Sequence, residues 1–463
     1  MGLTTMIRTF DFNKLPIVDI VNEILYDAAK RRASDIHFDP REKFTMIRIR
    51  VDGLLQDYAE VPSDVEKNLI TRIKIIGGMN ITESRLPQDG SIKIKIRDIN
   101  LDLRVSSLPT SLGEKVVIRI LDYSRSMSGL ESLDLSEENY KKVLEMMQIP
   151  NGIILVTGAT GSGKSTTVYS ILQRLNQPDT NIITVEDPVE MEIEGVNQVQ
   201  VNSEIGLTFA SALRSILRQD PNIIMIGEIR DTETAQIAVR ASITGHLVLS
   251  TIHTNNSLNT IERLTDMGVE KYLLASSLEG IISQKLARRL CPKCKKERKA
   301  NDYEKELIKK ALGKDIDQIW TAVGCDDCQN GYTGRIAIHE VLRVTQDIRD
   351  AISDGMPKDE LRKLVYSRTQ TLLQDGLEKA LSGETTIEEI LKLIELDVDD
   401  VKEEGELSLK DSMEESKISK ENEKVAEIEN LKEQVIESEE KKEMTPPLSN
   451  ISNESSISAE PLF

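Results

Sequence analysis

The 463-residue sequence is poor in several kinds of residue, and each shortage excludes a class of protein. Aromatic residues make up 3% of it, so it has few rings on which nucleic-acid bases could stack. It has 59 Lys and Arg against 78 Asp and Glu, a net charge of −19. A protein that coats nucleic acid needs the opposite sign. We therefore expect no direct contact with nucleic acid.

Long apolar runs and widely spread cysteines are also missing. No window of 18 apolar residues occurs, so no segment is expected to span a membrane. The start of the sequence lacks the basic and apolar regions of a secretory signal, and Met6 breaks the N-myristoylation pattern. All four cysteines fall between positions 291 and 328, whereas a disulfide-stabilised secreted protein would spread them. A cytoplasmic protein is expected.

Length and pattern predict two or three domains. Four segments differ in pattern: an N-terminal α/β domain (1–122), a polar linker (123–135), a domain in which apolar strands alternate with helices (136–396) and an acidic tail (397–463). The clearest expected elements are a helix over 17–30 and strands over 46–51, 91–96, 116–121, 153–157, 181–185, 223–226 and 247–251. Such alternation predicts a largely parallel sheet covered by helices. The tail has 20 acidic and 8 basic residues and one aromatic, which predicts disorder.

A glycine-rich segment matches the phosphate-binding P-loop. Residues 158–165 read Gly-Ala-Thr-Gly-Ser-Gly-Lys-Ser and lie between an expected strand and an expected helix, which is the context that this motif requires. Glycines let backbone N–H groups face the phosphates of ATP. Lys164 would reach the β and γ phosphates, and Ser165 would hold Mg²⁺. The predicted nucleotide-binding residues are Gly158, Ala159, Thr160, Gly161, Ser162, Gly163, Lys164, Ser165 and Thr166.

The segments after the P-loop carry the charged groups that phosphoryl transfer needs. Segment 186–190 holds three carboxylates at the end of one expected strand, and Glu228 ends another. Arg214 and Arg218 are spaced i and i+4, which predicts that they share one face of a helix. Segment 246–253 begins and ends with histidine.

Together these segments closely resemble the type II secretion and type IV pilus assembly ATPases. In that family, segment 186–190 is the acidic box, the stretch around Glu228 is Walker B, and segment 246–253 is the histidine box. The resemblance covers residues 18 to 395 and includes four upstream segments: 32–37, 50–53, 87–90 and 113–115. It implies a RecA-like P-loop motor domain preceded by a small α/β, PAS-like domain, assembled as a hexamer.

The resemblance also implies roles for individual residues. The family pattern makes Glu190 the carboxylate that orients the attacking water, with Glu186 and Glu228 as the alternatives. Arginines of both domains would supply positive charge, unless they form ordinary surface ion pairs, and His253 would shape the site by hydrogen bonding. The candidate catalytic residues are Glu190, Glu186, Glu228, Arg104, Arg119, Arg214, Arg218 and His253.

The four cysteines form two C-x₂-C pairs separated by 30 residues. Four thiolates suit a tetrahedral Zn²⁺ with no open position, so a structural zinc site is expected in the insert 291–328. The alternatives are a redox pair or unligated core cysteines. The predicted ligands are Cys291, Cys294, Cys325 and Cys328. This element resembles that of secretion and pilus-extension ATPases.

The leading interpretation is an ATPase that drives pilin or pseudopilin assembly under an inner-membrane platform protein. Such a protein would be cytoplasmic and would meet the membrane only through partners. A nucleic-acid motor for DNA uptake or translocation, on the same RecA-like core, is the main alternative. A non-catalytic, ATP-dependent adaptor is disfavoured because every hydrolytic group is present. Pilus, secretion and competence systems are not separated by these residues.

Overall fold

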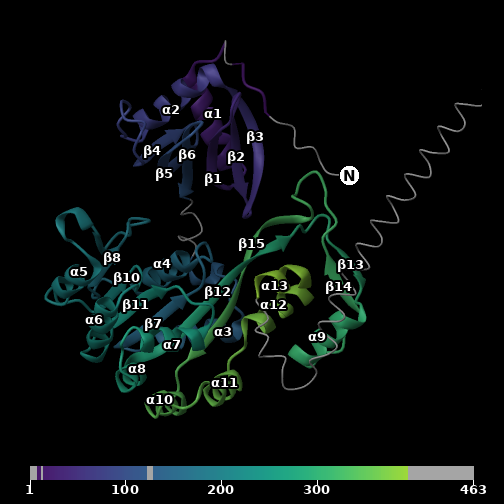
Figure 1. Cartoon of the computed structure of the whole chain (residues 1–463). Coiled ribbons are helices and arrows are strands. Elements are labelled where there is room, and N and C mark those ends of the chain that lie inside the picture. Colours follow the sequence, from purple (N-terminus) through teal and green to yellow (C-terminus); the bar gives the residue numbers. More distant parts are fainter. Residues whose placement is uncertain (1–7, 12–13, 122–128, 395–463) are drawn as a thin grey trace, which may run out of the picture. The chain divides into compact units, whose positions relative to one another are not determined.

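The computed structural model describes residues 8–11, 14–121 and 129–394 (Figure 1). The first 394 residues cluster as one compact unit that contains two large sheets. Residues 123–128 of the stretch expected as a linker, and the whole acidic tail, lie outside the described residues. Among the described helices, none combines the length and apolar character needed to cross a bilayer.

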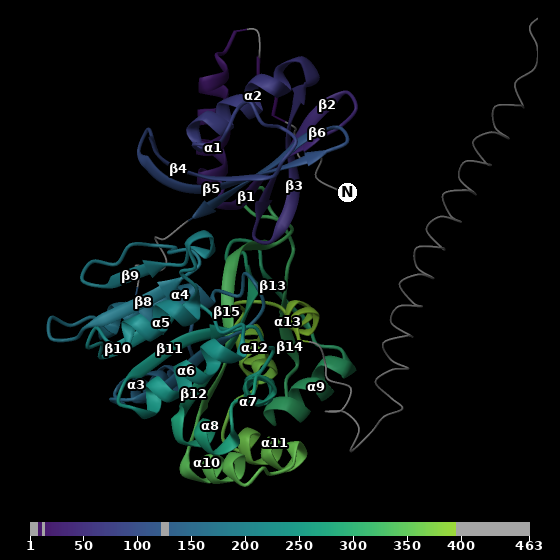
Figure 2. The same ribbon diagram turned by 60° about the vertical axis from the view of Figure 1, so that its left-hand side comes forward.

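The first sheet has six strands in the order β3-β2-β1-β6-β5-β4, and all neighbours are antiparallel. The strands are β1 (Ala33–Pro40), β2 (Phe44–Val51), β3 (Leu54–Pro62), β4 (Gln88–Ile96), β5 (Ile99–Thr110) and β6 (Gly113–Leu121). Two helices, α1 (Ile17–Lys30) and α2 (Ser63–Ile76), lie together on one side of this sheet (Figure 2).

Alternation along β2 shows why this sheet has one buried face. Ile47, Ile49 and Val51 are buried, whereas Arg48 and Arg50 are only half-buried. Successive side chains of a strand point to opposite faces, so the apolar face of β2 joins the core formed with α1 and α2. The charged face is left for ion pairs.

The second sheet has seven strands in the order β15-β12-β7-β11-β10-β8-β9. All neighbours are parallel except β15, which is antiparallel to β12. The strands are β7 (Gly152–Thr157), β8 (Ile182–Glu186), β9 (Asn197–Gln200), β10 (Ile223–Ile226), β11 (Leu247–Ile252), β12 (Leu278–Leu290) and β15 (Tyr332–Arg343). The largely parallel sheet predicted from the alternating pattern is confirmed.

Helices cover both faces of the second sheet (Figure 1). Along β7, Ile153 and Leu155 belong to one core cluster, while Ile154 and Val156 belong to another. The associated helices are η2 (Leu130–Ser132), α3 (Glu137–Met147), α4 (Lys164–Leu175), η3 (Ser203–Ile205), α5 (Phe209–Ile216), α6 (Thr232–Ile243), α7 (Ser257–Asp266), α8 (Lys271–Ser277), α10 (Gln346–Ser353) and α11 (Lys358–Tyr366). A strand buried on both faces is apolar throughout, as β7 is.

A smaller module is inserted between β12 and β15. It contains β13 (Lys296–Lys299), α9 (Asp302–Leu312) and β14 (Gln318–Thr321), and it shares a core with α12 (Leu372–Leu381) and α13 (Ile387–Leu393). The stretch after the cysteines begins with the twelve-residue strand β15. The helices follow it.

Candidate nucleotide site and cysteine cluster

The P-loop joins β7 to α4, which begins at Lys164. Gly158 has φ 149°, and a Cβ there would lie 2.4 Å from the backbone oxygen of Gln284. Gly163 has φ 90°, and a Cβ there would lie 3.1 Å from the Gln284 side-chain nitrogen. Only glycine meets both the backbone conformation and the close approach of β12. The sequence motif therefore has a steric reason at these two positions.

Lys164 is held inside the loop. Its Nζ donates hydrogen bonds to the carbonyl oxygens of Gly158, at 2.8 Å, and Ala159, at 3.0 Å. Burial lowers the pKa of Lys164, and the negative charge of Glu228 opposes that shift. The ammonium group is therefore close both to the loop backbone and to Glu228.

The buried side-chain amide of Gln284 supports the P-loop through hydrogen bonds. Gln284 lies in β12 and is 2% exposed. Its Nε2 donates to the Ser162 carbonyl oxygen at 2.7 Å, and its Oε1 accepts from Thr167 Oγ1 at 2.7 Å. One side chain thus connects the loop, the first turn of α4 and β12.

Glu186 ends β8 and is 3% exposed. Its carboxylate accepts hydrogen bonds from Thr184 Oγ1 at 2.5 Å, from Gln198 Nε2 at 3.1 Å and from the hydroxyl of Tyr169. Three donors stabilise this buried charge. Both of its oxygens are already engaged with protein groups.

Glu190 has a different environment. Its Oε2 lies 3.2 Å from Nη2 of Arg104, which also donates to the Val189 carbonyl oxygen at 3.3 Å. Burial raises the pKa of Glu190, and the charges of Arg104 and Arg119 partly counter this. Arg119 itself pairs with Asp35 at 3.3 Å. The structure therefore brings Glu190 near both candidate arginines of the first sheet, Arg104 and Arg119.

Glu228 follows β10 and faces Lys164, Arg230 and His253. Its Oε2 is buried without a hydrogen-bond partner among the described residues, and it lies 3.6 Å from His253 Nε2. Burial lowers the pKa of His253, and the positive charge of Lys164 lowers it further. A neutral imidazole beside a carboxylate can hydrogen-bond water or a phosphate oxygen.

Arg214 and Arg218 do not share a helix, which corrects the expectation from their spacing. Helix α5 ends at Ile216, because the chain turns before Pro221, where helical backbone is disfavoured. Arg214 pairs with Glu233, and Arg218 Nη1 donates to the Arg214 carbonyl oxygen at 2.7 Å. These contacts join them to surface groups and not to the P-loop residues described above.

The four cysteines meet in one cluster, as their spacing predicts. Their Sγ atoms all lie within 4.8 Å of one another, with separations such as 3.9 Å for Cys291 to Cys325 and 3.6 Å for Cys294 to Cys328. Four thiolates around Zn²⁺, at Zn–S distances of about 2.3 Å, stand roughly 3.8 Å apart in a tetrahedron. The cluster therefore fits a tetrahedral metal ion.

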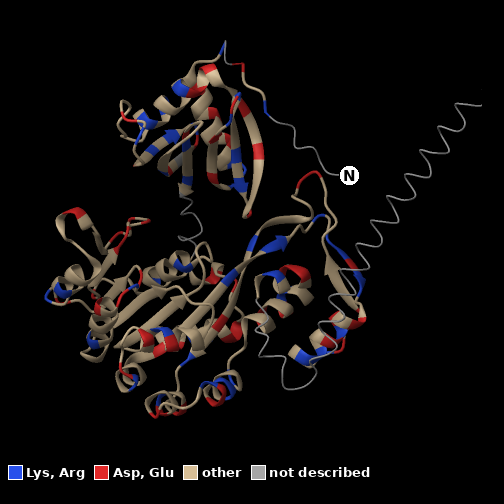
Figure 3. Cartoon of the chain, viewed as in Figure 1, with Lys and Arg blue, Asp and Glu red and all other residues tan. Residues whose placement is uncertain are grey.

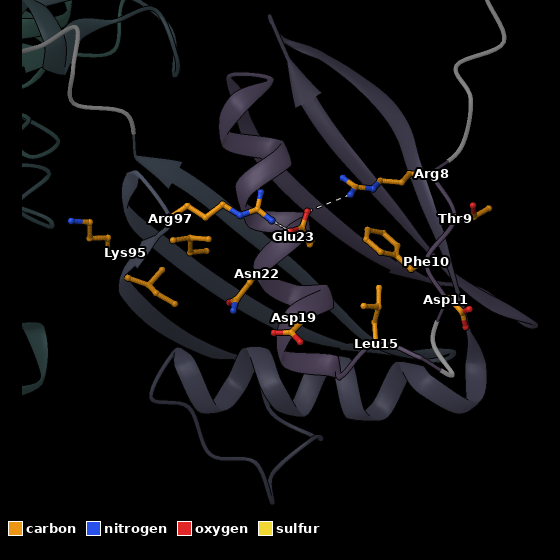
Figure 4. A pocket seen from close by; sticks show the side chains of 12 residues that line it. Arg8, Thr9, Phe10, Asp11, Leu15, Asp19, Asn22, Glu23, Lys95 and Arg97 are labelled. Carbon is orange, nitrogen blue, oxygen red and sulfur yellow. Dashed lines mark hydrogen bonds and ion pairs between the residues drawn. The ribbon is translucent and has the colours of Figure 1, made fainter.

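A large cavity of about 670 Å³ lies elsewhere, against α1 and β4 of the first sheet. Figure 4 shows Arg8 and Arg97 directed toward Glu23 at its wall, and both arginines form ion pairs with this glutamate. None of the candidate catalytic or nucleotide-binding residues lines it.

Comparison with known proteins identifies the family. The family model described as type II/IV secretion system protein matches residues 12–392. The chain belongs to this family. It is 45% identical over 379 residues to type II secretion system protein E of Aeromonas hydrophila, covering 82% of this chain and 75% of that protein. It is 44% identical over 379 residues to type II secretion system ATPase E of Vibrio cholerae, covering 82% of this chain and 75% of that protein.

Solved structures agree with this assignment. The pilus retraction motor PilT, solved with bound ADP, is 27% identical, with a TM-score of 0.57, over 82% of this chain and 98% of that one. The DotB ATPase of Legionella pneumophila shares the fold, with 22% identity and a TM-score of 0.61, over 83% of this chain and 98% of that one. Membership of this family makes the chain an ATPase, with ATP as its nucleotide.

Two residues that contact the site were not identified from the sequence. Gln284 and Tyr169 are both buried and both hydrogen-bond to site segments. Neither belongs to a phosphate-binding or acidic motif. The available signal was local: a glutamine inside a mostly apolar run, and a tyrosine five residues after the P-loop lysine.

Proposed function

We propose that the protein is a cytoplasmic, homohexameric motor that hydrolyses ATP to drive pilin or pseudopilin assembly in a type II secretion or type IV pilus system. Family membership and the names of the relatives support the secretion or pilus setting. The observation that carries the catalytic part is the contrast between Glu186 and Glu190. Beside a complete P-loop, one carboxylate is saturated by buried donors and the other faces arginine.

This contrast favours Glu190 as the residue that orients the attacking water. A general base needs a carboxylate oxygen that water can reach, and a pKa raised toward the working pH improves its efficiency. Glu190 is about one-third exposed and burial raises its pKa. Glu186 is better suited to holding the backbone of the acidic box in place.

The remaining roles follow from the chemistry of ATP. The backbone of the P-loop and Lys164 bind the phosphates, and Ser165 holds Mg²⁺, which neutralises charge on the phosphates when bound. The free oxygen of Glu228 binds a water of the metal, and His253 hydrogen-bonds the γ-phosphate side of the site. Arg104 and Arg119 supply positive charge to the transferring phosphoryl group. Arg214 and Arg218 act at the surface between neighbouring subunits.

The chain divides into functional segments in this proposal. Residues 1–122 form an α/β domain that supplies Arg104 and Arg119, 123–135 a linker, 136–396 the motor, and 397–463 an acidic tail. Head-to-tail contacts between motors close a ring. The ring acts beneath an inner-membrane platform protein, and the membrane is contacted only through that partner.

The four cysteines hold one structural Zn²⁺ in this proposal. They provide four soft ligands and no open position, so the metal stabilises the module between β12 and β15 and takes no part in hydrolysis. The Sγ separations described above support this assignment.

The catalytic assignment is tested with two matched variants. Glu190→Gln keeps the size of the side chain but removes its charge, so kcat should fall by roughly 10²-fold while ATP affinity is retained. Glu186→Gln places an amide among three donors, so we expect a lower melting temperature as its main effect. Near wild-type turnover of Glu190→Gln, together with a fully folded but inactive Glu186→Gln, would reverse the assignment.

The motor assignment is tested separately. ATPase activity per subunit should rise with protein concentration as rings form, as measured by turnover together with light scattering. In Figure 3 the lysine and arginine residues are interspersed with aspartate and glutamate on helices such as α10 and α11, which does not favour a nucleic-acid surface. A fully active monomer would contradict the ring, and stimulation of activity by DNA would favour the DNA-motor alternative.

A further inference from the structure

Tyr169 connects the P-loop helix to the acidic box through one hydroxyl group. It lies on α4, five residues after Lys164, and is 3% exposed. Its hydroxyl donates a hydrogen bond to Glu186 Oε2 and accepts one from the backbone N–H of Glu190 at 3.1 Å. In the described part of the chain, Tyr169 is the side chain that hydrogen-bonds to both glutamates.

The two hydrogen bonds depend on each other. Because the Tyr169 hydroxyl points its hydrogen at the carboxylate of Glu186, its oxygen lone pairs are left to accept from the N–H of Glu190. Thr184 and Gln198 hold Glu186 from its other oxygen, so the acceptor is itself fixed. Burial and the charge of Glu186 raise the pKa of Tyr169 well above its usual value, so the hydroxyl stays protonated.

Other side chains hold the backbone on either side of Glu190: Arg104 Nη2 donates to the Val189 carbonyl oxygen at 3.3 Å, and Gln198 Nε2 donates to the Met191 carbonyl oxygen at 2.9 Å. Arg104 contacts the Glu190 side chain, and the neighbouring Val189 N–H donates to Gln200 Oε1 at a long 3.4 Å. The Tyr169 hydroxyl is the side-chain acceptor of the Glu190 N–H itself. It comes from the helix whose first residue is Lys164, the lysine of the P-loop.

We propose that Tyr169 is a positioning residue, which fixes the Glu190 backbone at a set distance from the P-loop and thereby places the Glu190 carboxylate for hydrolysis. This inference rests on the proposed role of Glu190. Tyr169 does not contact the substrate. Its effect is geometric, and a misplacement of about 1 Å at a catalytic group can cost on the order of 10²-fold in rate.

Tyr169→Phe removes the hydroxyl and keeps the ring in the core. We expect kcat to fall about tenfold or more, while the Kd for a fluorescent ATP analogue and the KM for ATP stay within about twofold. A loss confined to packing would change the melting temperature and nucleotide affinity instead. A variant with wild-type kcat, or with kcat and affinity equally impaired, would overturn the proposal.

Two control variants separate positioning from general damage. Tyr332→Phe removes another buried hydroxyl, which lies 3.0 Å from Thr386 Oγ1 in the cysteine-bearing part of the fold. Thr184→Val removes a donor from Glu186 but leaves the contact between Tyr169 and Glu190. Tyr332→Phe should keep kcat within about twofold of wild type, and Thr184→Val should lower kcat by less than Tyr169→Phe does. Equal losses in Thr184→Val and Tyr169→Phe would place the effect on Glu186 and overturn the inference.

A double variant distinguishes this inference from the proposed function. If Tyr169 acts through Glu190, adding Tyr169→Phe to Glu190→Gln should lower kcat by less than about twofold, because coupled residues are not additive. A full additional loss overturns the positioning role while leaving Glu190 as the catalytic residue. A near wild-type rate for Glu190→Gln alone overturns the proposed function itself.

Discussion

Replacing Gln284 with methionine tests how far the conformation of the P-loop depends on its hydrogen bonds to the neighbouring strand β12. Methionine has a similar volume and no hydrogen-bonding amide, so packing losses should stay below about 1.5 kcal/mol. The Ser162 carbonyl oxygen loses its 2.7 Å donor, and Thr167 Oγ1 loses its 2.7 Å acceptor. The hydroxyl of Thr167 has a second acceptor in the Gly163 carbonyl oxygen, at 3.4 Å, so most of the loss falls on Ser162.

The hydrogen bond lost by the Ser162 carbonyl oxygen sets the expected size of the effect on ATP binding. A buried polar group left without a partner costs about 1–3 kcal/mol. If this cost falls on the loop conformation that binds phosphate, the Kd for ATP should rise roughly tenfold, since about 1.4 kcal/mol is one factor of ten. Titration with a fluorescent ATP analogue at 25 °C measures Kd, and thermal unfolding confirms that the variant is folded.

Thr167→Val is the matched control for this prediction. It removes the hydroxyl but leaves the contact between Gln284 and Ser162, so the Kd should rise less than in Gln284→Met. A Kd within about twofold of wild type for Gln284→Met would refute the reasoning, as would a larger effect for Thr167→Val.

Three further predictions concern other parts of the molecule. Cys294→Ser should lower bound zinc from about one ion per chain, measured by metal analysis, and lower the melting temperature without abolishing ATP binding; absence of zinc from the wild-type protein would contradict it. The turnover of the enzyme should fall as pH drops through the raised pKa of Glu190, and Arg104→Gln should move this acid limb to higher pH, because Arg104 lowers that pKa; an unmoved limb would count against Glu190. His339 is fully buried, and neither nitrogen of its ring has a hydrogen-bond partner among the described residues. Burial, and to a smaller extent the positive charge of Lys379, holds the pKa of His339 well below 6.5. Below about pH 6.5 the unfolded chain therefore binds more protons than the folded chain. The free energy of unfolding should thus decrease as the pH is lowered through this range. Urea unfolding of His339→Leu should show a weaker pH dependence in that range, and an unchanged slope would contradict the assignment.

Elements with a strong local pattern were predictable from the sequence. The helix expected over 17–30 is α1, and the strand expected over 223–226 is β10. Both have an apolar periodicity that the surrounding structure also uses. The P-loop was predictable because its glycines and lysine meet chemical needs that few other residues satisfy.

The pair β12 and β15 was not predicted. Within β12, Ile282, Leu286 and Leu290 recur every four residues, a spacing that a helix would also show, so local periodicity does not identify the strand. The sheet decides the conformation, because β12 pairs with β7 on one side and with β15 on the other. Long-range pairing of this kind leaves little trace in the local sequence.

The different surroundings of the two acidic-box glutamates were likewise beyond the sequence. Glu186 and Glu190 are the same residue type, four positions apart. Only the fold reveals that Tyr169, Thr184 and Gln198 surround the first of them. These donors come from α4, β8 and β9, and their convergence is a property of the sheet order.

The course of β12 has a mechanical consequence. Gln284, at the middle of β12, hydrogen-bonds to the P-loop, and Cys291 directly follows the last residue of β12. At about 3.3 Å per residue, these two points lie roughly 23 Å apart along one extended backbone. A strand hydrogen-bonded to its neighbours resists stretching, so a pull on the cysteine end is transmitted along its axis to the phosphate-binding loop. The cysteine-bearing module and the P-loop are thus joined by a strand that resists extension.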